Sequence, residues 1–270
     1  MTTGLVLFAV MGNTMAASEK AGTSGQETQA AKPKQTQHMQ HRRGPKQYAL
    51  AGAEGATITL WKPDLTKIPL EQKHLMHGTI TLPRTGLDNY HAIVAEKDWG
   101  DVKESVIRYE YLRGKPSKNS PTLLSNAQKS TFEIVPDPIP RGHYHYFTGQ
   151  KWSFITRFRD QPVPNLPVVF ETANGSRIET KSDANGRVKI LIPTDFPNLV
   201  QGERDKRSSD FMLSADYQEF GISYQSMLSA EYRINRLNWR SVEWGVVVAG
   251  IGILGGGLAR RSVKNRRGRA

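Results

Sequence analysis

The chain has 270 residues, a net charge of +12 and no cysteine. Disulfides, thiolate metal sites and cysteine nucleophiles are therefore excluded, and the length is enough for one large or two small domains. Six basic and two acidic residues lie in 1–48, and six basic and no acidic residues in 260–270, which leaves 25 basic and 23 acidic residues in 49–259. Because the body is close to neutral and carries no basic stripe, we expect no nucleic-acid binding.

The first residues have the pattern of a secretory leader. Leu5 to Val10 is an apolar run, and small residues follow it at Ala16 and Ala17. Since the run is far shorter than the roughly 20 residues of a membrane span, we predict a signal peptide over 1–17. A buried N-terminal strand is the alternative. Residues 18–48 have almost no large apolar side chains, and we predict a disordered linker there.

The other end of the chain has the pattern of a membrane anchor. Trp244 to Ala259 contains no charged residue and six glycines, which would cost a water-soluble helix about 1 kcal/mol each. We therefore predict a transmembrane helix over 242–259. The basic tail 260–270 then lies in the cytoplasm by the positive-inside rule. Together with a leader, this predicts a single-pass protein of the cell inner membrane whose main body is periplasmic or otherwise extracytoplasmic.

Between the two ends, short alternating segments are separated by turn residues, and helical periodicity is almost absent. This pattern is typical of β-sandwiches. The predicted strands are Thr57–Trp61, Gly78–Leu82, His91–Glu96, Ser105–Leu112, Thr131–Val135, Lys151–Arg159, Val168–Thr172, Arg177–Lys181, Arg187–Ile192, Phe211–Tyr217 and Ile222–Tyr232.

Three prolines in Pro136–Pro140 interrupt the strand pattern, because proline cannot donate to a sheet ladder. We interpret this segment as a connector. The prediction is an all-β fold of two small Ig-like or prealbumin-like β-sandwich portions, 49–136 and 141–236, followed by the C-terminal transmembrane helix.

Two turns in the second portion have a specific chemistry. Asn174-Gly175 favours the positive φ angles of a hairpin turn, although Asn174-Gly175-Ser176 also spells a glycosylation sequon. In Ser182–Gly186, Asp183 can accept hydrogen bonds from the backbone that follows it, and Gly186 supplies a left-handed residue. In contrast, Glu104 to Tyr111 alternates charged residues with tyrosines and predicts a half-exposed strand.

Part of the chain resembles a known family. The matching segments are Phe132-Glu133-Ile134-Val135-Pro136, Trp152 to Asp160, Pro162 to Val169, and Ser182 to Gly186 with Ile190 and Pro193. They resemble a bacterial periplasmic family of unassigned function that includes proteins described as the periplasmic component of cobalt/nickel ABC-type transport. The second portion also resembles carboxypeptidase regulatory-like, prealbumin-type sandwiches. The resemblance implies an extracytoplasmic β-sandwich and transition-metal transport. Members commonly place a histidine before an aromatic near the mature N-terminus, and Thr57–Trp61 lacks it.

The sequence contains none of the common catalytic signatures, so we predict a protein that is not an enzyme. The strongest candidate for a metal site is His143-Tyr144-His145-Tyr146, because a strand would place both imidazoles on one face. Two neutral imidazoles suit Ni or Co and need a third ligand, for which His91 is the candidate. The alternative is that these histidines are packing residues.

The leading hypothesis is a membrane-anchored extracytoplasmic β-sandwich protein that acts as a binding or scaffold component. It would need no cofactor, and its partners would be the membrane and a membrane or periplasmic protein. The alternative is a Ni/Co-binding accessory of an uptake system, with His143, His145 and His91 as ligands.

Overall fold

The computed structural model describes residues 6–9, 46–52, 54–71, 75–76, 78–141 and 145–240, with the backbone alone for 6–9 and 75–76. The predicted span 242–259, the tail 260–270 and His143 lie outside the described residues. In the ranges that are described, neither helix is long and apolar enough to cross a membrane.

The prediction of an all-β fold is confirmed, and all eleven predicted strands are present. The strands are β1 (Val6–Ala9), β2 (Gln47–Ala51), β3 (Thr57–Trp61), β4 (Lys67–Pro69), β5 (Leu75–Met76), β6 (Thr79–Thr81), β7 (Leu87–Asp98), β8 (Val102–Leu112), β9 (Lys115–Pro116), β10 (Phe132–Pro136), β11 (Tyr146–Phe147), β12 (Lys151–Phe158), β13 (Gln161–Pro162), β14 (Pro167–Thr172), β15 (Arg177–Lys181), β16 (Arg187–Leu191), β17 (Ser208–Glu219) and β18 (Ile222–Arg233). The helices are α1 (Pro121–Asn126) and the 3₁₀ helix η2 (Arg236–Trp239).

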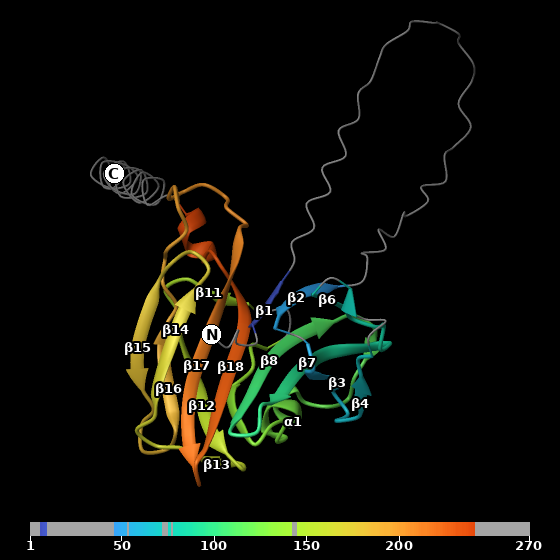
Figure 1. Cartoon of the computed structure of the whole chain (residues 1–270). Coiled ribbons are helices and arrows are strands. Elements are labelled where there is room, and N and C mark those ends of the chain that lie inside the picture. The colour runs from blue at the N-terminus through green and yellow to red at the C-terminus, as the bar shows by residue number, and fades with distance from the viewer. Residues whose placement is uncertain are drawn as a thin grey trace, which may run out of the picture.

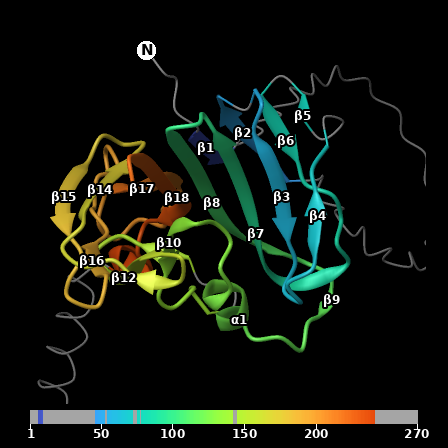
Figure 2. The same cartoon turned by 60° about the horizontal axis from the view of Figure 1, so that its bottom comes forward.

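A ten-stranded sheet forms the centre of the molecule. Its main path is β15-β14-β17-β18-β8-β7-β3-β4, with β11 beside β18 and β9 beside β7. Two smaller sheets, β1-β2-β6-β5 and the group β10, β12, β13 and β16, pack against it. Figure 2 shows the two small sheets on opposite sides of the long one.

The alternation of side chains along β8 and β18 produces two separate cores. Ile107 and Leu228 point into the larger core, which they share with Phe154 of β12. Their neighbours Val106 and Met227 point into the other core, together with residues of β2 and β6. Adjacent residues of a strand face opposite sides, so one sheet serves both sandwich layers.

The two predicted portions are joined more closely than a connector implies. β18 of the second portion pairs in parallel with β8 of the first, with Ser226 opposite Ser105. The predicted boundary at 48 falls inside β2, where Tyr48 is buried, whereas the predicted boundary at 136 coincides with the last residue of β10, the buried Pro136. Pro136 lies opposite Phe154 in the ladder with β12. The sequence pattern predicts strands, but it does not show which distant strands pair.

Both predicted turns are present, but in the Asn174-Gly175 pair only Gly175 takes the predicted positive φ. Gly175 has φ +99° between the paired strands β14 and β15, and Gly186 has φ +68°. One carboxylate oxygen of Asp183 accepts hydrogen bonds from the backbone N–H groups of Asn185 and Arg187, at 2.8 and 2.9 Å. The side chain of Asn174 donates to the hydroxyl of Tyr232 at 2.9 Å, so it ties the β14–β15 turn to β18.

Candidate functional site

Three β-hairpins end at the same pole of the molecule. They join β7 to β8, β12 to β13, and β17 to β18, and they lie at the bottom of Figure 1. Two contacts connect them: the amide of Ser223 donates to the carbonyl of Asp101 at 2.8 Å, and a guanidinium nitrogen of Arg159 lies 3.8 Å from the carboxylate of Glu219. The sheet order places these turns side by side, although they are far apart in the sequence.

Two of these turns hold ordinary residues in the left-handed region. Phe220 has φ +51°, Arg159 φ +48° and Asp160 φ +65°. Asn and Gly adopt this region most easily, and it is unfavourable for a bulky side chain such as Phe. Strained residues of this kind persist where the surrounding structure holds them, and they are common at functional sites.

The same turns expose large side chains. Phe220 is 88% exposed and Trp99 is 41% exposed, and the side chain of Arg159 is 61% exposed. Aromatic and arginine side chains are the types that contribute most to protein interfaces. We call Trp99, Arg159, Asp160 and Phe220 the tip surface.

The β7–β8 turn, which carries Trp99 of the tip surface, is held by hydrogen bonds and a ring contact. The indole N–H of Trp99 donates to Glu104 at 2.9 Å, and the ammonium of Lys97 lies 3.9 Å above the indole ring. A carboxylate oxygen of Asp98 accepts from the amide of Gly100 at 2.8 Å. A turn fixed in this way loses little conformational entropy when it binds a partner.

A polar cleft of about 380 Å³ opens beside the tip surface. Residues that line it include Lys97, Asp98, Lys103, Ser130, Thr131 and Tyr224. The amide of Arg159 donates to the carbonyl of Thr131 at 2.7 Å, which links the β12–β13 turn directly to the cleft wall. The cleft offers basic, acidic and hydroxyl groups together, a lining suited to a polar peptide segment.

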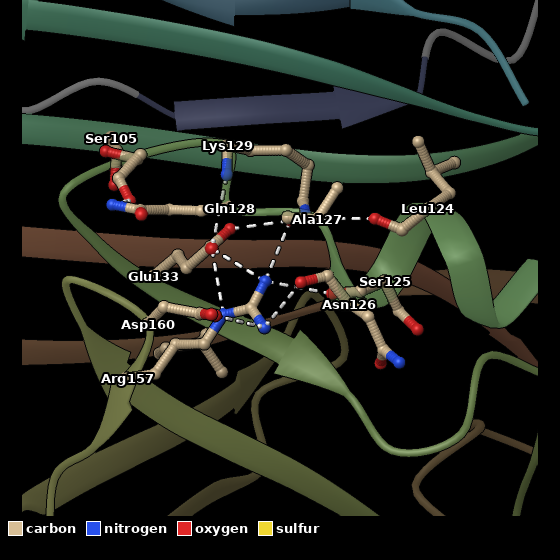
Figure 3. Close-up of polar contacts among 12 residues, drawn as sticks. Ser105, Leu124, Ser125, Asn126, Ala127, Gln128, Lys129, Glu133, Arg157 and Asp160 are labelled. Atoms are coloured by element: carbon tan, nitrogen blue, oxygen red, sulfur yellow. Dashed lines mark hydrogen bonds and ion pairs between the residues drawn. The ribbon is translucent and has the colours of Figure 1, made fainter. Parts of the chain in front are cut away.

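A buried ionic cluster supports the wall of the cleft from behind (Figure 3). Arg157 donates through Nε to Glu133 at 2.9 Å. It also donates to the carbonyls of Ser125, Asn126 and Ala127. Lys129 lies 3.4 Å from the second oxygen of Glu133, and burial lowers the pKa of Lys129 to about 8. These cations satisfy the free carbonyls at the C-terminal end of α1 and thereby hold the chain that leads to Ser130.

A second ionic cluster lies on the opposite face of the long sheet. Arg108 is completely buried; it donates to Glu110 at 3.1 Å, Ser229 at 2.7 Å and Asp210 at 3.0 Å. The prediction of a half-exposed strand over 104–111 is wrong over 104–108, where every residue is buried, because β2 and its neighbours cover one face of β8 and β10 covers the other. Lys46 completes the cluster with an ion pair to Glu110 at 2.6 Å.

The predicted site residue His91 is fully buried and has both ring nitrogens engaged. Nδ1 lies 3.0 Å from the carbonyl of Asn89, so it donates. Nε2 is 2.8 Å from the hydroxyl of Thr85 and accepts from it in the neutral ring. Burial lowers the pKa of His91. As placed, the ring has no lone pair free for a metal.

The predicted site residue His145 is half-buried just before β11. Its Nδ1 lies 4.0 Å from Glu231, but Arg233 already donates to that carboxylate at 2.6 Å. Burial, and then the charge of Arg233, lower the pKa of His145 to about 4. His143 lies outside the described residues. Across the part of the chain that the structure describes, no three His, Asp or Glu side chains are arranged to hold a metal.

Sequence reasoning missed the tip surface, although one signal was present. Phe220-Gly221 lies between two long alternating runs, in the position where Asn-Gly is the usual pair. A phenylalanine at that position does not stabilise the hairpin turn, and the difference from the usual Asn-Gly pair can be seen in the sequence alone.

Comparison with known proteins gives no family. No protein-family model matches the sequence, and no curated protein matches it. Among solved structures, the chain is similar to a 1.5-MDa bacterial ice-binding adhesin, with 13% identity and a TM-score of 0.27 over 71% of this chain and 58% of that one. A Ca²⁺-stabilized adhesin of an Antarctic bacterium has 14% identity and a TM-score of 0.26, over 71% of this chain and 44% of that one.

A segment of two fibronectin type-III domains from chicken tenascin is also similar, with 13% identity and a TM-score of 0.20 over 70% of this chain and 93% of that one. The chain thus spans 58% and 44% of the two adhesin structures. No conclusion about function follows from likenesses of this size.

Proposed function

We propose that this protein is a non-catalytic binding or scaffold component that is anchored in the cell inner membrane and holds its β-sandwich body outside the cytoplasm. The body recognises a protein partner through the tip surface. The observation that carries this proposal is Phe220, which is 88% exposed on a turn whose backbone disfavours it. A large apolar side chain held in water on a strained turn is costly unless a partner covers it.

The position of the tip surface suits an anchor at the C-terminal end. β18 starts at the tip surface and runs toward η2, which lies at the top of Figure 1. Its twelve residues extend for about 40 Å, at roughly 3.3 Å per residue. With the predicted span 242–259 following η2, the tip surface faces away from the bilayer and toward other proteins.

The engaged nitrogens of His91 favour this function over the Ni/Co-binding alternative. A metal would have to displace the Thr85 hydroxyl from Nε2, and Asn89 holds the other nitrogen. The low pKa of His145 is the result of burial beside Arg233, which is not a setting that attracts a cation.

Site-specific photocrosslinking in intact cells tests the partner. A photoreactive phenylalanine derivative at position 220, which keeps the aromatic ring, should form a discrete adduct with one protein. The matched control is position 200, because Val200 is also an exposed apolar residue, 51% accessible. It lies at the opposite end of the molecule, in a segment that contacts η2 through the amide of Gly202, which donates to the carbonyl of Asn238 at 2.7 Å. The same adduct from both positions, or none from position 220, would contradict the proposal.

Protease treatment of spheroplasts tests the topology separately. The body should be digested, while a tag fused after Ala270 is spared, because the basic tail is expected in the cytoplasm. Loss of the tag together with the body would rule out the proposed orientation.

A further inference from the structure

We propose that the outer edge of β2 is a strand-acceptor site, which Val6–Ala9 fills in this chain and which an extended apolar segment of a partner protein fills once the leader has been removed. The inference rests on the proposed extracytoplasmic location, together with removal of the leader that we predict over 1–17. It concerns a surface distinct from the tip surface, on the other small sheet.

The geometry of the site is that of an added sheet strand. β1 pairs with β2 in an antiparallel ladder, from Val6 opposite Ala51 to Ala9 opposite Tyr48. The other edge of β2 is already paired with β6. β1 therefore occupies the one open edge of β2, and removing it leaves backbone N–H and C=O groups of that edge without partners.

The surroundings of β1 make a vacant site unfavourable. β1 lies against β8 and β18 as well as beside β2, and these two strands carry Arg108 and Ser229 of the buried ionic cluster. The guanidinium of Arg108 has no exposure in the occupied state. When β1 leaves, water approaches the ionic cluster of Arg108 and the edge of the core that contains residues of β2 and β6. A replacement strand restores the backbone hydrogen bonds to β2 and again shields the cluster from water.

The chain itself indicates what the replacement looks like. The four residues of β1, VLFA, are uncharged and apolar. The occupant is therefore an extended, uncharged segment of at least four residues that runs antiparallel to β2. The connection between the two strands, residues 10–45, keeps β1 at a high local concentration, so a strand from another molecule fills the site only after β1 has been cut away.

Nicking the full chain tests the site directly. A protease site is inserted between residues 18 and 45, and the purified protein is compared before and after cleavage. The probe is a fluorescent peptide of residues 4–11 with two added lysines for solubility, followed by anisotropy. Because a tethered strand competes at an effective concentration of about 1 mM, the nicked protein should bind the peptide at least about tenfold more tightly than the intact chain. Mass spectrometry should detect release of the leader fragment.

The control peptide carries Phe8→Pro. Leu50 donates its N–H toward β6, so the neighbouring residue Ala49 faces β1, and proline at position 8 opposite it removes a ladder donor. Equal binding by nicked and intact chains, equal binding of the proline peptide, or no binding to the nicked chain would each overturn the acceptor site. N-terminal sequencing of the protein extracted from membranes reports leader removal independently. A retained leader would overturn the exchange with a partner strand, because β1 would keep the site in the mature protein. Protease treatment of spheroplasts reports the proposed location separately, so the two failures are distinguishable.

Discussion

Arg108 on β8 and Asp210 on β17 form an ion pair of 3.0 Å across the strand that lies between them. The pair connects the two halves of the long sheet, since β8 belongs to the first predicted portion and β17 to the second. Arg108 is fully buried, and the nearby carboxylates of Glu110 and Asp210 keep its pKa raised despite the burial. The guanidinium is therefore charged at every pH at which the protein is folded.

Replacing Arg108 with Met should lower the free energy of unfolding by about 3–5 kcal/mol, because the change leaves Asp210 and Glu110 beside an apolar side chain. Chemical denaturation measures the loss. The matched control is Arg177→Met, which removes an ion pair on a half-exposed edge strand and should cost about 0–1 kcal/mol. Similar losses for the two variants would mean that the buried pair does not hold the sheet together.

Replacing Phe220 with Asn should raise the free energy of unfolding by about 0.5–1 kcal/mol, since Asn tolerates the left-handed φ of this turn. The same variant should lose the partner adduct, which is read from a photoreactive residue placed at position 99. Phe220→Ala is the control: it removes the ring but keeps the backbone strain, so it should lose the adduct without gaining stability. A decrease in stability for Phe220→Asn would show that the ring supports the fold.

The imidazole of His145 should titrate with a pKa of about 4, measured by NMR on protein with labelled histidine. In the unfolded chain the value is near 6.5, so the unfolded state binds a proton first as the pH falls. His145 therefore lowers the free energy of unfolding as the pH falls from about 6.5 to about 4. In His145→Gln, the decrease in unfolding free energy between pH 7 and pH 4.5 should be smaller than in the parent. An unchanged pH dependence would contradict the low pKa.

Gly186→Ala should destabilise the protein by about 3 kcal/mol, because a Cβ at this position would lie 2.8 Å from the carbonyl oxygen of Thr156 in addition to the strain of a positive φ. Gly221→Ala has the same type of strain but no atom within 4 Å of the added methyl, and it should cost only about 1 kcal/mol. Thermal denaturation of both variants measures the difference. Equal costs would mean that the backbone at Gly186 moves freely away from Thr156.

Much of the local structure was predictable from the sequence. Alternation over Lys151–Phe158 and Ile222–Arg233 predicted β12 and β18, because one face of each strand is apolar. The turn chemistry of Asp183 and Gly186 was predictable because it depends only on residues within the turn. The short edge strands β4, β9 and β13 carry too few alternating residues to be recognised in this way.

The candidate sites depended on the tertiary structure. His91 has a sequence context that suits a ligand, yet Thr85 and Asn89 take both of its nitrogens. Trp99, Arg159 and Phe220 come from turns far apart in the chain, and no spacing rule relates them. Their common position results from the order of strands in the sheets.

By itself, the sequence determined the all-β class, the positions of eleven strands and the chemistry of two turns, since hydrophobic alternation and turn residues act over a few positions. Only the tertiary structure decided that β18 lies beside β8, that Arg108 is buried and that three turns meet at one pole. Strand pairing depends on contacts between residues more than a hundred positions apart, such as Arg108 and Ser229. A local pattern contains no information about such partners, because many strand orders bury the same apolar faces.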